Sequence, residues 1–336
     1  MNKKTLISLV VIVAVISTAS AIFYSCRRDP SKPAYTEDLL RRAQEGDVNA
    51  EFFIGRSYYD GNGVERDYRK AVEYFRSTAA KGSVRGQCGL GWCYFYGQGV
   101  PVDYRKAVKW LTLASNAGHP LARYLLGVCY LKGHGVAKDE IEGLHLLDEA
   151  ISLGAVEAIT EKGIYYRRCN KLEKGLELIR KASDKGDPRA QFIIGLYHYR
   201  GTAVQQDFEL AVDYFKEAAN GGFVAAQRAL GTCYFYGDGV AQDYEKAVKW
   251  WMCASKQGDS ESQYNLAFCY MKGRGVYQDD NEAFRLFTLS ASSPNEYALS
   301  AHQLAECYHH GIGTERNDSL SDMWRQRAAQ LGYIGR

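Results

Sequence analysis

A glycine that recurs at a nearly constant interval is the feature that most limits how this chain can fold. Six such glycines lie 36 residues apart, except for one interval of 32, and two alanines extend the series. We call these reference positions: Gly55, Gly91, Gly127, Gly163, Gly195, Gly231, Ala267 and Ala305. Self-similarity at this period is typical of repeat architectures. The sequence therefore predicts eight stacked repeats, although a length of 336 residues alone also allows two ordinary domains.

Each repeat contains two helical patterns separated by a glycine turn. In the second repeat, Leu90 and Tyr94 flank the reference glycine at the spacing of one helix face. The turn that follows has the sequence Gly-x-Gly-Val at residues 61–64, 97–100, 133–136, 237–240 and 273–276, and it is varied at 201–204 and 311–314. These patterns predict a helix-turn-helix in each repeat.

The predicted helix ends carry residue types that stabilise the backbone at helix termini. An aspartate precedes the second helix of most repeats, and its carboxylate can accept bonds from the free amides of the first turn. These aspartates are Asp67, Asp103, Asp139, Asp207, Asp243 and Asp279. A closing glycine, which tolerates the left-handed conformation that ends a helix, follows at Gly82, Gly118, Gly154, Gly186, Gly222, Gly258 and Gly332.

At these residues the chain resembles the Sel-one-like repeat family, a relative of the tetratricopeptide repeats. The sixth repeat matches the family pattern at Ala226, Leu230, Gly231, Tyr234, Gly237, Gly239, Val240, Asp243, Lys246, Ala247 and Trp250. The resemblance covers roughly residues 36–335. It implies an all-α, right-handed α-solenoid of about eight helix-turn-helix repeats, a tetratricopeptide-like superhelix that follows an N-terminal hydrophobic segment.

We expect the repeats at about residues 48–83, 84–119, 120–155, 156–187, 188–223, 224–259, 260–297 and 298–335. Residues 36–45 resemble an unpaired second helix that opens the stack. Repeat four departs from the pattern, because residues 166–171 lack the glycine turn and the repeat is four residues short. Repeat seven carries residues 292–295 where its closing glycine should be, which predicts a bend or loop. Neighbouring repeats must stack, because a single helix pair cannot cover both of its apolar faces.

Residues 1–25 differ in character from the rest of the chain. Lys3 and Lys4 precede an almost unbroken apolar run at residues 6–24, which predicts a segment that engages a membrane. Three interpretations fit it: a secretory signal cleaved near residues 19–21, a lipoprotein site with lipidation at Cys26, or an uncleaved anchor. Residues 26–35 follow as a linker. We expect a membrane-anchored or cell-envelope protein whose repeat domain lies outside the cytoplasm.

Charge and composition argue against nucleic acid as a partner. The net charge is only +3, and acidic and basic residues are interleaved along the chain. A phosphate backbone is bound by a sustained positive surface, which this sequence does not contain. The expected partners are therefore a protein or peptide ligand and, through the N-terminal segment, a membrane.

The first helix of each repeat has a second face that tetratricopeptide-like folds turn into a concave groove. Residues three before, one after and four after the reference position form one stripe on that face, since they fall within about 60° of each other. The stripe is rich in aromatic residues and predicts a peptide-binding groove at Phe52, Tyr59, Trp92, Phe95, Tyr124, Phe192, Tyr199, Phe235, Tyr264 and Phe268. The alternative is that adjacent first helices bury many of these rings as ordinary core.

The cysteines and histidines are the residues on which metal or catalytic chemistry would depend. Cys93, Cys129, Cys233, Cys269 and Cys307 all stand two residues after the reference position, which favours a small core residue over a disulfide or zinc ligand. The cysteine-rich branch of the resembled family pairs cysteines eight residues apart, a spacing absent here. Cys307, His309 and His310, with His302 nearby, form a metal-like cluster. The glycosylation triplet at Asn317 coincides with a helix-cap position.

Some relatives in the resembled family have been called β-lactamases. This sequence contains no Ser-x-x-Lys, no Lys-Thr-Gly and no Gly-x-Ser-x-Gly, and no phosphate-binding loop of the Walker type. We therefore predict a non-enzymatic interaction scaffold with no catalytic residues, no metal and no cofactor. The alternative is a secreted or envelope hydrolase, or a metal-binding protein that uses the cluster of Cys307, His309 and His310.

Overall fold

The computed structural model describes residues 35–292 and 297–333. The membrane segment at 1–25, Cys26 and the linker, apart from its last residue, lie outside the described residues, as does most of the loop expected at 292–295. Within the described part of the chain, none of the helices combines the length and the apolar character that a membrane crossing requires.

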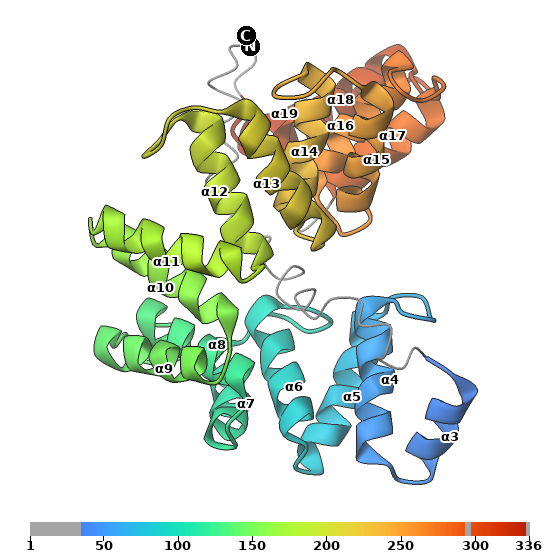
Figure 1. Ribbon diagram of the computed structural model, residues 1–336. Helices are drawn as coiled ribbons and strands as arrows, with labels where there is room; N and C mark the ends of the chain where they lie inside the picture. Colours follow the sequence, from blue (N-terminus) through green and yellow to red (C-terminus); the bar gives the residue numbers. More distant parts are fainter. Residues whose placement is uncertain (1–34, 293–296, 334–336) are drawn as a thin grey trace. The chain divides into compact units, whose positions relative to one another are not determined.

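The described chain is entirely helical in its regular structure, with 17 helices and no strands in the residues described (Figure 1). The prediction of an all-α, helix-turn-helix repeat fold is confirmed. The chain divides into two compact bodies at residues 187 and 188. We call their described parts the N-terminal body, residues 35–187, and the C-terminal body, residues 188–333.

The helices of each body alternate between the first and second helix of successive repeats. The N-terminal body contains α3 (Glu37–Gln44), α4 (Val48–Asp60), α5 (Tyr68–Ala80), α6 (Val84–Tyr96), α7 (Tyr104–Asn116), α8 (Pro120–Lys132), α9 (Glu140–Ser152), α10 (Val156–Arg168) and α11 (Leu172–Asp184). The C-terminal body contains α12 (Pro188–Arg200), α13 (Phe208–Asn220), α14 (Val224–Tyr236), α15 (Tyr244–Ser255), α16 (Ser260–Lys272), α17 (Asp280–Ala291), α18 (Ala298–His310) and α19 (Asp318–Gln330).

In each body every helix packs against the next one along the chain. The helix α3 is the expected unpaired second helix, capped by Thr36. In the second repeat the helices begin at Val84 and Tyr104. The core of each body is therefore continuous from repeat to repeat, as expected of a solenoid.

The predicted caps lie where the sequence places them. Asp103 accepts a bond from the backbone amide of Lys106, at 2.9 Å, and Asp243 does the same for Lys246. Asn317 takes the equivalent position ahead of α19, where its side chain accepts from Leu320 at 3.0 Å. These side chains satisfy amides of the first helical turn that have no partner within the helix.

The second glycine of the Gly-x-Gly turn serves the stacking of repeats. Gly99 has φ +73°, and a Cβ there would collide with the backbone carbonyl of Tyr68, the first residue of the preceding repeat's second helix. The same approach recurs at Gly239 against Phe208. Only a residue without a side chain allows the turn of one repeat to sit on the start of the previous second helix.

The boundary between the two bodies coincides with the irregular part of the repeat pattern. Repeat four replaces the glycine turn with residues 169–171, in which Asn170 takes the left-handed conformation at φ 58°. Repeat five carries Ala203, at φ 66°, where other repeats carry the second glycine. The sequence departures at repeats four and five thus mark where the compact bodies divide.

Candidate functional site

In each first helix, the face that carries the reference position packs against the second helix of the same repeat. A Cβ at Gly91 would lie 2.8 Å from Cγ of Leu111 on α7. A Cβ at Gly231 would lie 2.5 Å from Nε1 of Trp251 on α15. Real Cβ atoms do not approach other atoms so closely, so this face cannot bind a ligand.

The predicted groove stripe lies largely inside the protein. Six of its ten residues are buried: Phe52, Tyr59, Trp92, Tyr124, Phe192 and Phe235. Trp92 is fully buried, and its Nε1 donates to the hydroxyl of Tyr59 at 2.8 Å and to Oε1 of Gln98 at 3.1 Å. These rings are ordinary core between neighbouring helices, which agrees with the alternative stated from the sequence.

The other four residues of the stripe are half-buried: Phe95, Tyr199, Tyr264 and Phe268. Phe95 meets the ring of Tyr104 edge-on at 5.5 Å. Tyr199 donates its hydroxyl to Oδ2 of Asp238 at 2.7 Å, and burial followed by this bond raises the pKa of the phenol. A role of these residues in binding a partner stays a prediction.

An exposed tyrosine that the predicted stripe omits lies on the first helices of the C-terminal body. Tyr236, at the end of α14, is 49% exposed. Burial raises the pKa of Tyr264 on α16, and Tyr333 and then Tyr236 raise it further. We call Tyr236, Tyr264 and Phe268 the aromatic patch. Tyr236 stands one helical turn beyond the stripe position Thr232, so extending the stripe by four residues would have found it.

A buried ion network joins α14 to the start of α16. Arg228 on α14 is 3% exposed and pairs with Asp259 at 2.7 Å and with Glu261 at 3.3 Å. Asp259 also caps α16 by accepting from the amide of Ser262 at 2.8 Å. Burial raises the pKa of Glu261, and Arg228 acts against that shift. The network therefore links the first helices of repeats six and seven through charge.

The side chains of Cys307, His309 and His310 in repeat eight do not converge on one point. Cys307 is 1% exposed and faces the hydrophobic core. His309 contacts Oδ1 of Asp318 at 3.0 Å, and His310 contacts Glu306 at 3.5 Å, on the surface. No group of three metal-ligating side chains occurs among the residues that the structure describes. Cys307 and the two histidines therefore do not form a ligand set.

The repeated cysteines are core residues with free thiols. Cys93, Cys129, Cys233, Cys269 and Cys307 are all buried. Burial raises the pKa of Cys129, Cys233 and Cys269 to about 12 and that of Cys307 to about 11. Since the thiolate is the reactive form, these thiols are poor nucleophiles and poor metal ligands at neutral pH.

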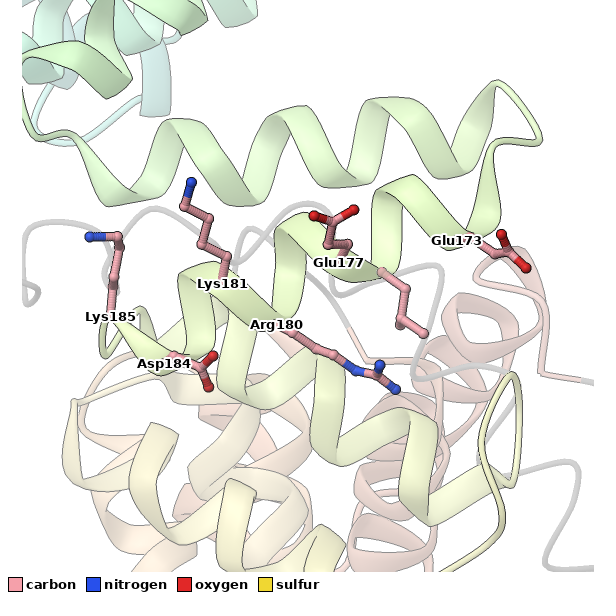
Figure 2. Close-up of a pocket in the computed structure, with 7 residues that line it drawn as sticks. Glu173, Glu177, Arg180, Lys181, Asp184 and Lys185 are labelled. Atoms are coloured by element: carbon pink, nitrogen blue, oxygen red, sulfur yellow. The ribbon is translucent and has the colours of Figure 1, made fainter.

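A hollow with a volume of about 520 Å³ runs along α11 (Figure 2). Its lining comes from that one helix: Glu173, Leu176, Glu177, Arg180, Lys181, Asp184 and Lys185. Figure 2 shows the charged side chains leaving the helix in different directions rather than converging on one point. Three acidic and three basic groups balance each other there, so the hollow has the character of a solvated helix face.

Comparison with known proteins gives the chain a family. The model of the Sel1 repeat matches eight segments, residues 48–83, 84–119, 120–154, 160–187, 188–223, 224–259, 260–295 and 298–333. The predicted resemblance and the number of repeats are thereby confirmed.

Two solved structures show the same fold over most of the chain. A Sel1 repeat protein from Oxalobacter formigenes is 27% identical, with a TM-score of 0.55, over 93% of this chain and 91% of its own. The protein c5321, a protective antigen of uropathogenic Escherichia coli with an SLR fold, is 27% identical with a TM-score of 0.55. That match covers 90% of this chain and 65% of the other.

A curated relative matches over a short stretch. A retron Vc95 probable ATPase of Vibrio cholerae serotype O1 biovar El Tor is 36% identical over 47 residues. The match covers 14% of this chain and 9% of the relative. The chain thus spans only a small part of that protein and about two thirds of c5321.

Proposed function

Because the chain belongs to the Sel1 repeat family, we propose that it is an interaction scaffold that binds a protein or peptide partner through the first helices of its C-terminal body. Sel1 repeat proteins are generally protein-interaction scaffolds, and their solenoid fold is typically non-enzymatic. The finer proposal concerns the surface used, the setting of the protein and the chemical class of the partner.

The aromatic patch carries this proposal. Tyr236 is 49% exposed, whereas Tyr264 and Phe268 are half-buried and packed against the core behind them. Rings held in this way present apolar area to a partner at little cost in conformational entropy, and tyrosine is enriched among the residues that dominate binding energy. A protein ligand suits such a surface better than a nucleic acid, which binds mainly through phosphate contacts.

The first test compares partner capture by two variants of the full chain. Tyr236→Ala combined with Tyr264→Ala removes most of the aromatic patch. Met323→Ala removes a side chain of similar exposure, 48%, from the second helix α19 and serves as the control. Proteins captured from native membranes by the wild type are quantified by mass spectrometry.

We expect a specific protein to be lost by the double variant and kept by Met323→Ala. The double variant should melt at a lower temperature than the wild type, because Tyr264 packs against the core, so capture is measured at a temperature at which circular dichroism shows both variants folded. Equal capture by all three proteins would reject the aromatic patch as the binding surface. Capture of RNA or DNA in place of a protein would overturn the partner class.

The proposed setting is a membrane or the cell envelope, with the repeats outside the cytoplasm. It rests on the apolar run at residues 6–24, on Lys3 and Lys4, and on Cys26. Mass spectrometry of the mature protein distinguishes the three interpretations, because a lipoprotein begins at a lipid-modified Cys26, a cleaved signal leaves an unmodified new terminus, and an anchor keeps residues 1–25. Recovery of the intact chain in the soluble cytoplasmic fraction would overturn the setting.

A further inference from the structure

One arginine in the C-terminal body is fixed in place and exposed without an opposing charge. Arg274, in the turn after α16, lies over three aromatic rings. Its Cζ is 5.7 Å from the ring centre of Phe235, 5.8 Å from that of Tyr244 and 5.7 Å from that of Phe268. Each distance is within the roughly 6 Å at which a cation is attracted to a ring face. The three rings therefore hold the guanidinium from the direction of the core.

The backbone on both sides of Arg274 is held as well. Its amide donates to the carbonyl of Cys269 at 3.0 Å. Gly273 and Gly275 flank it with φ 63° and 73°, and a Cβ at Gly275 would collide with the backbone of Tyr244. A charged group whose backbone and side chain are both held in advance loses little freedom when it binds.

In other turns, the side chain of the equivalent residue is occupied by a contact with the preceding repeat. Gln98 accepts from the hydroxyl of Tyr59, and His134 stacks on Tyr104 with ring centres 4.2 Å apart. Asp238 accepts from Tyr199 at 2.7 Å. Arg274 makes the same backward contact, but the rings that it meets leave its positive charge unneutralised.

Further exposed groups lie beside Arg274 in the chain. Lys272 ends α16 and is exposed, and Tyr277 is 96% exposed. Among the described residues, no carboxylate pairs with either Lys272 or Arg274. The nearest carboxylate along the chain, that of Asp279, caps α17 by accepting from Glu282 at 2.9 Å. In contrast Lys132, which occupies the position of Lys272 in repeat three, pairs with Glu161 at 3.1 Å.

We propose that Arg274, together with Lys272 and Tyr277, binds an acidic peptide segment of a protein partner. A guanidinium presents its donors in a plane that matches a carboxylate, and the exposed ring of Tyr277 supplies apolar contact for the rest of a peptide. Two positive charges suit a short acidic segment, whereas a phosphate backbone is bound by an extended positive surface. This inference rests on the proposed function and adds the chemistry of the partner.

The test measures binding of labelled peptides to the full chain in a neutral detergent by fluorescence anisotropy. The probe is a fluorescein-labelled decapeptide of glutamate, and a decapeptide of glutamine controls for charge. Arg274→Ala removes the guanidinium, and Arg274→Lys keeps the charge but loses the planar group. Arg285→Ala is the matched control, because Arg285 is exposed on α17 but already pairs with Glu282 at 2.7 Å.

We expect the glutamate probe to bind the wild type more tightly than the glutamine probe. Arg274→Ala should weaken glutamate binding by about tenfold or more, Arg274→Lys should weaken it less, and Arg285→Ala should change it less than about twofold. Equal binding of both peptides, or equal effects of Arg274→Ala and Arg285→Ala, would overturn the proposal. Stronger Arg274-dependent binding of a ten-nucleotide DNA strand or of anionic lipid vesicles would overturn it too.

The two proposals fail in different ways. If the glutamate probe does not bind but a protein is still captured through Tyr236 and Tyr264, the scaffold stands and its acidic partner is wrong. If the probe binds through Arg274 but the tyrosine variant captures its partner normally, the acidic site stands and the aromatic patch is wrong. Circular dichroism of each variant separates loss of binding from loss of fold.

Discussion

The two bodies carry different types of side chain at the same position of the repeat. Three residues before the reference position, the N-terminal body buries Phe52, Cys88, Tyr124 and Thr160, all uncharged. The C-terminal body begins with the buried ring of Phe192 and continues with Arg228, Tyr264 and His302. At this position the N-terminal body therefore has only uncharged side chains, whereas the C-terminal body also has a buried guanidinium. The same helix-turn-helix plan tolerates both, because the backbone contacts that stack the repeats come from the turns.

The difference extends to the surface of the first helices. In the N-terminal body, α6 packs against α8 and α8 against α10, and Leu125 and Val128 are buried. In the C-terminal body, Tyr236, Tyr264 and Phe268 stay partly accessible. Repeats that share one backbone plan can therefore differ in how much aromatic surface their first helices leave accessible.

The largest expected effect comes from breaking the charge network. Arg228→Ala leaves Asp259 and Glu261 without their guanidinium, and an uncompensated buried charge costs about 3–5 kcal/mol. We expect urea unfolding to report this loss, and hydrogen exchange to rise in residues 224–272. The comparison between the bodies predicts that exchange in residues 35–187 stays unchanged. Equal acceleration in both bodies would contradict it, and Arg285→Ala, at an exposed pair, should have almost no effect.

A smaller loss is expected where a side chain is added at the close contact between helices. Gly231→Ala places a methyl group against Trp251, and Gly91→Ala places one against Leu111. Overpacking of this kind costs about 1–3 kcal/mol. Ala267→Gly is the converse change at the reference position of repeat seven, and it should also lower stability, by about 1 kcal/mol, because glycine is unfavourable in a helix interior. The melting temperature should fall for Gly231→Ala and Gly91→Ala. The two decreases should be similar if the contact between the paired helices is equally tight in both bodies.

The hydrogen bonds of Trp92 should stabilise the N-terminal body, and a substitution of Trp92 tests this. Trp92→Phe removes the indole N–H that serves Tyr59 and Gln98, in a fully buried site. Losing a buried hydrogen bond and some volume should cost about 1–2 kcal/mol. Exchange should rise in residues 48–96 and not in residues 188–333. A variant as stable as the wild type would show that these bonds contribute no net stability.

The backbone plan of the molecule could be predicted from the sequence, because glycines and caps act locally. Asp103 and Gly99 lie where the pattern requires a cap and a left-handed turn. The exposure of side chains could not be predicted in the same way. Whether Trp92 or Tyr236 meets solvent depends on how closely neighbouring first helices approach, and that spacing is set by side chains about 36 residues away. The pairing of Arg228 with Asp259, 31 residues apart, has the same origin.

The smallest expected effect is a change in how stability depends on pH. Burial raises the pKa of Glu261, so between the pKa of the unfolded chain and this raised value the folded protein holds a proton that the unfolded chain has released. Stability from this group is therefore lost as pH rises through that interval. Glu261→Gln cannot ionise, so its melting temperature relative to the wild type should be higher at pH 7 than at pH 4. Glu245→Gln, at an exposed residue of α15, is the control, and a difference independent of pH would mean that Glu261 titrates like a solvated carboxylate.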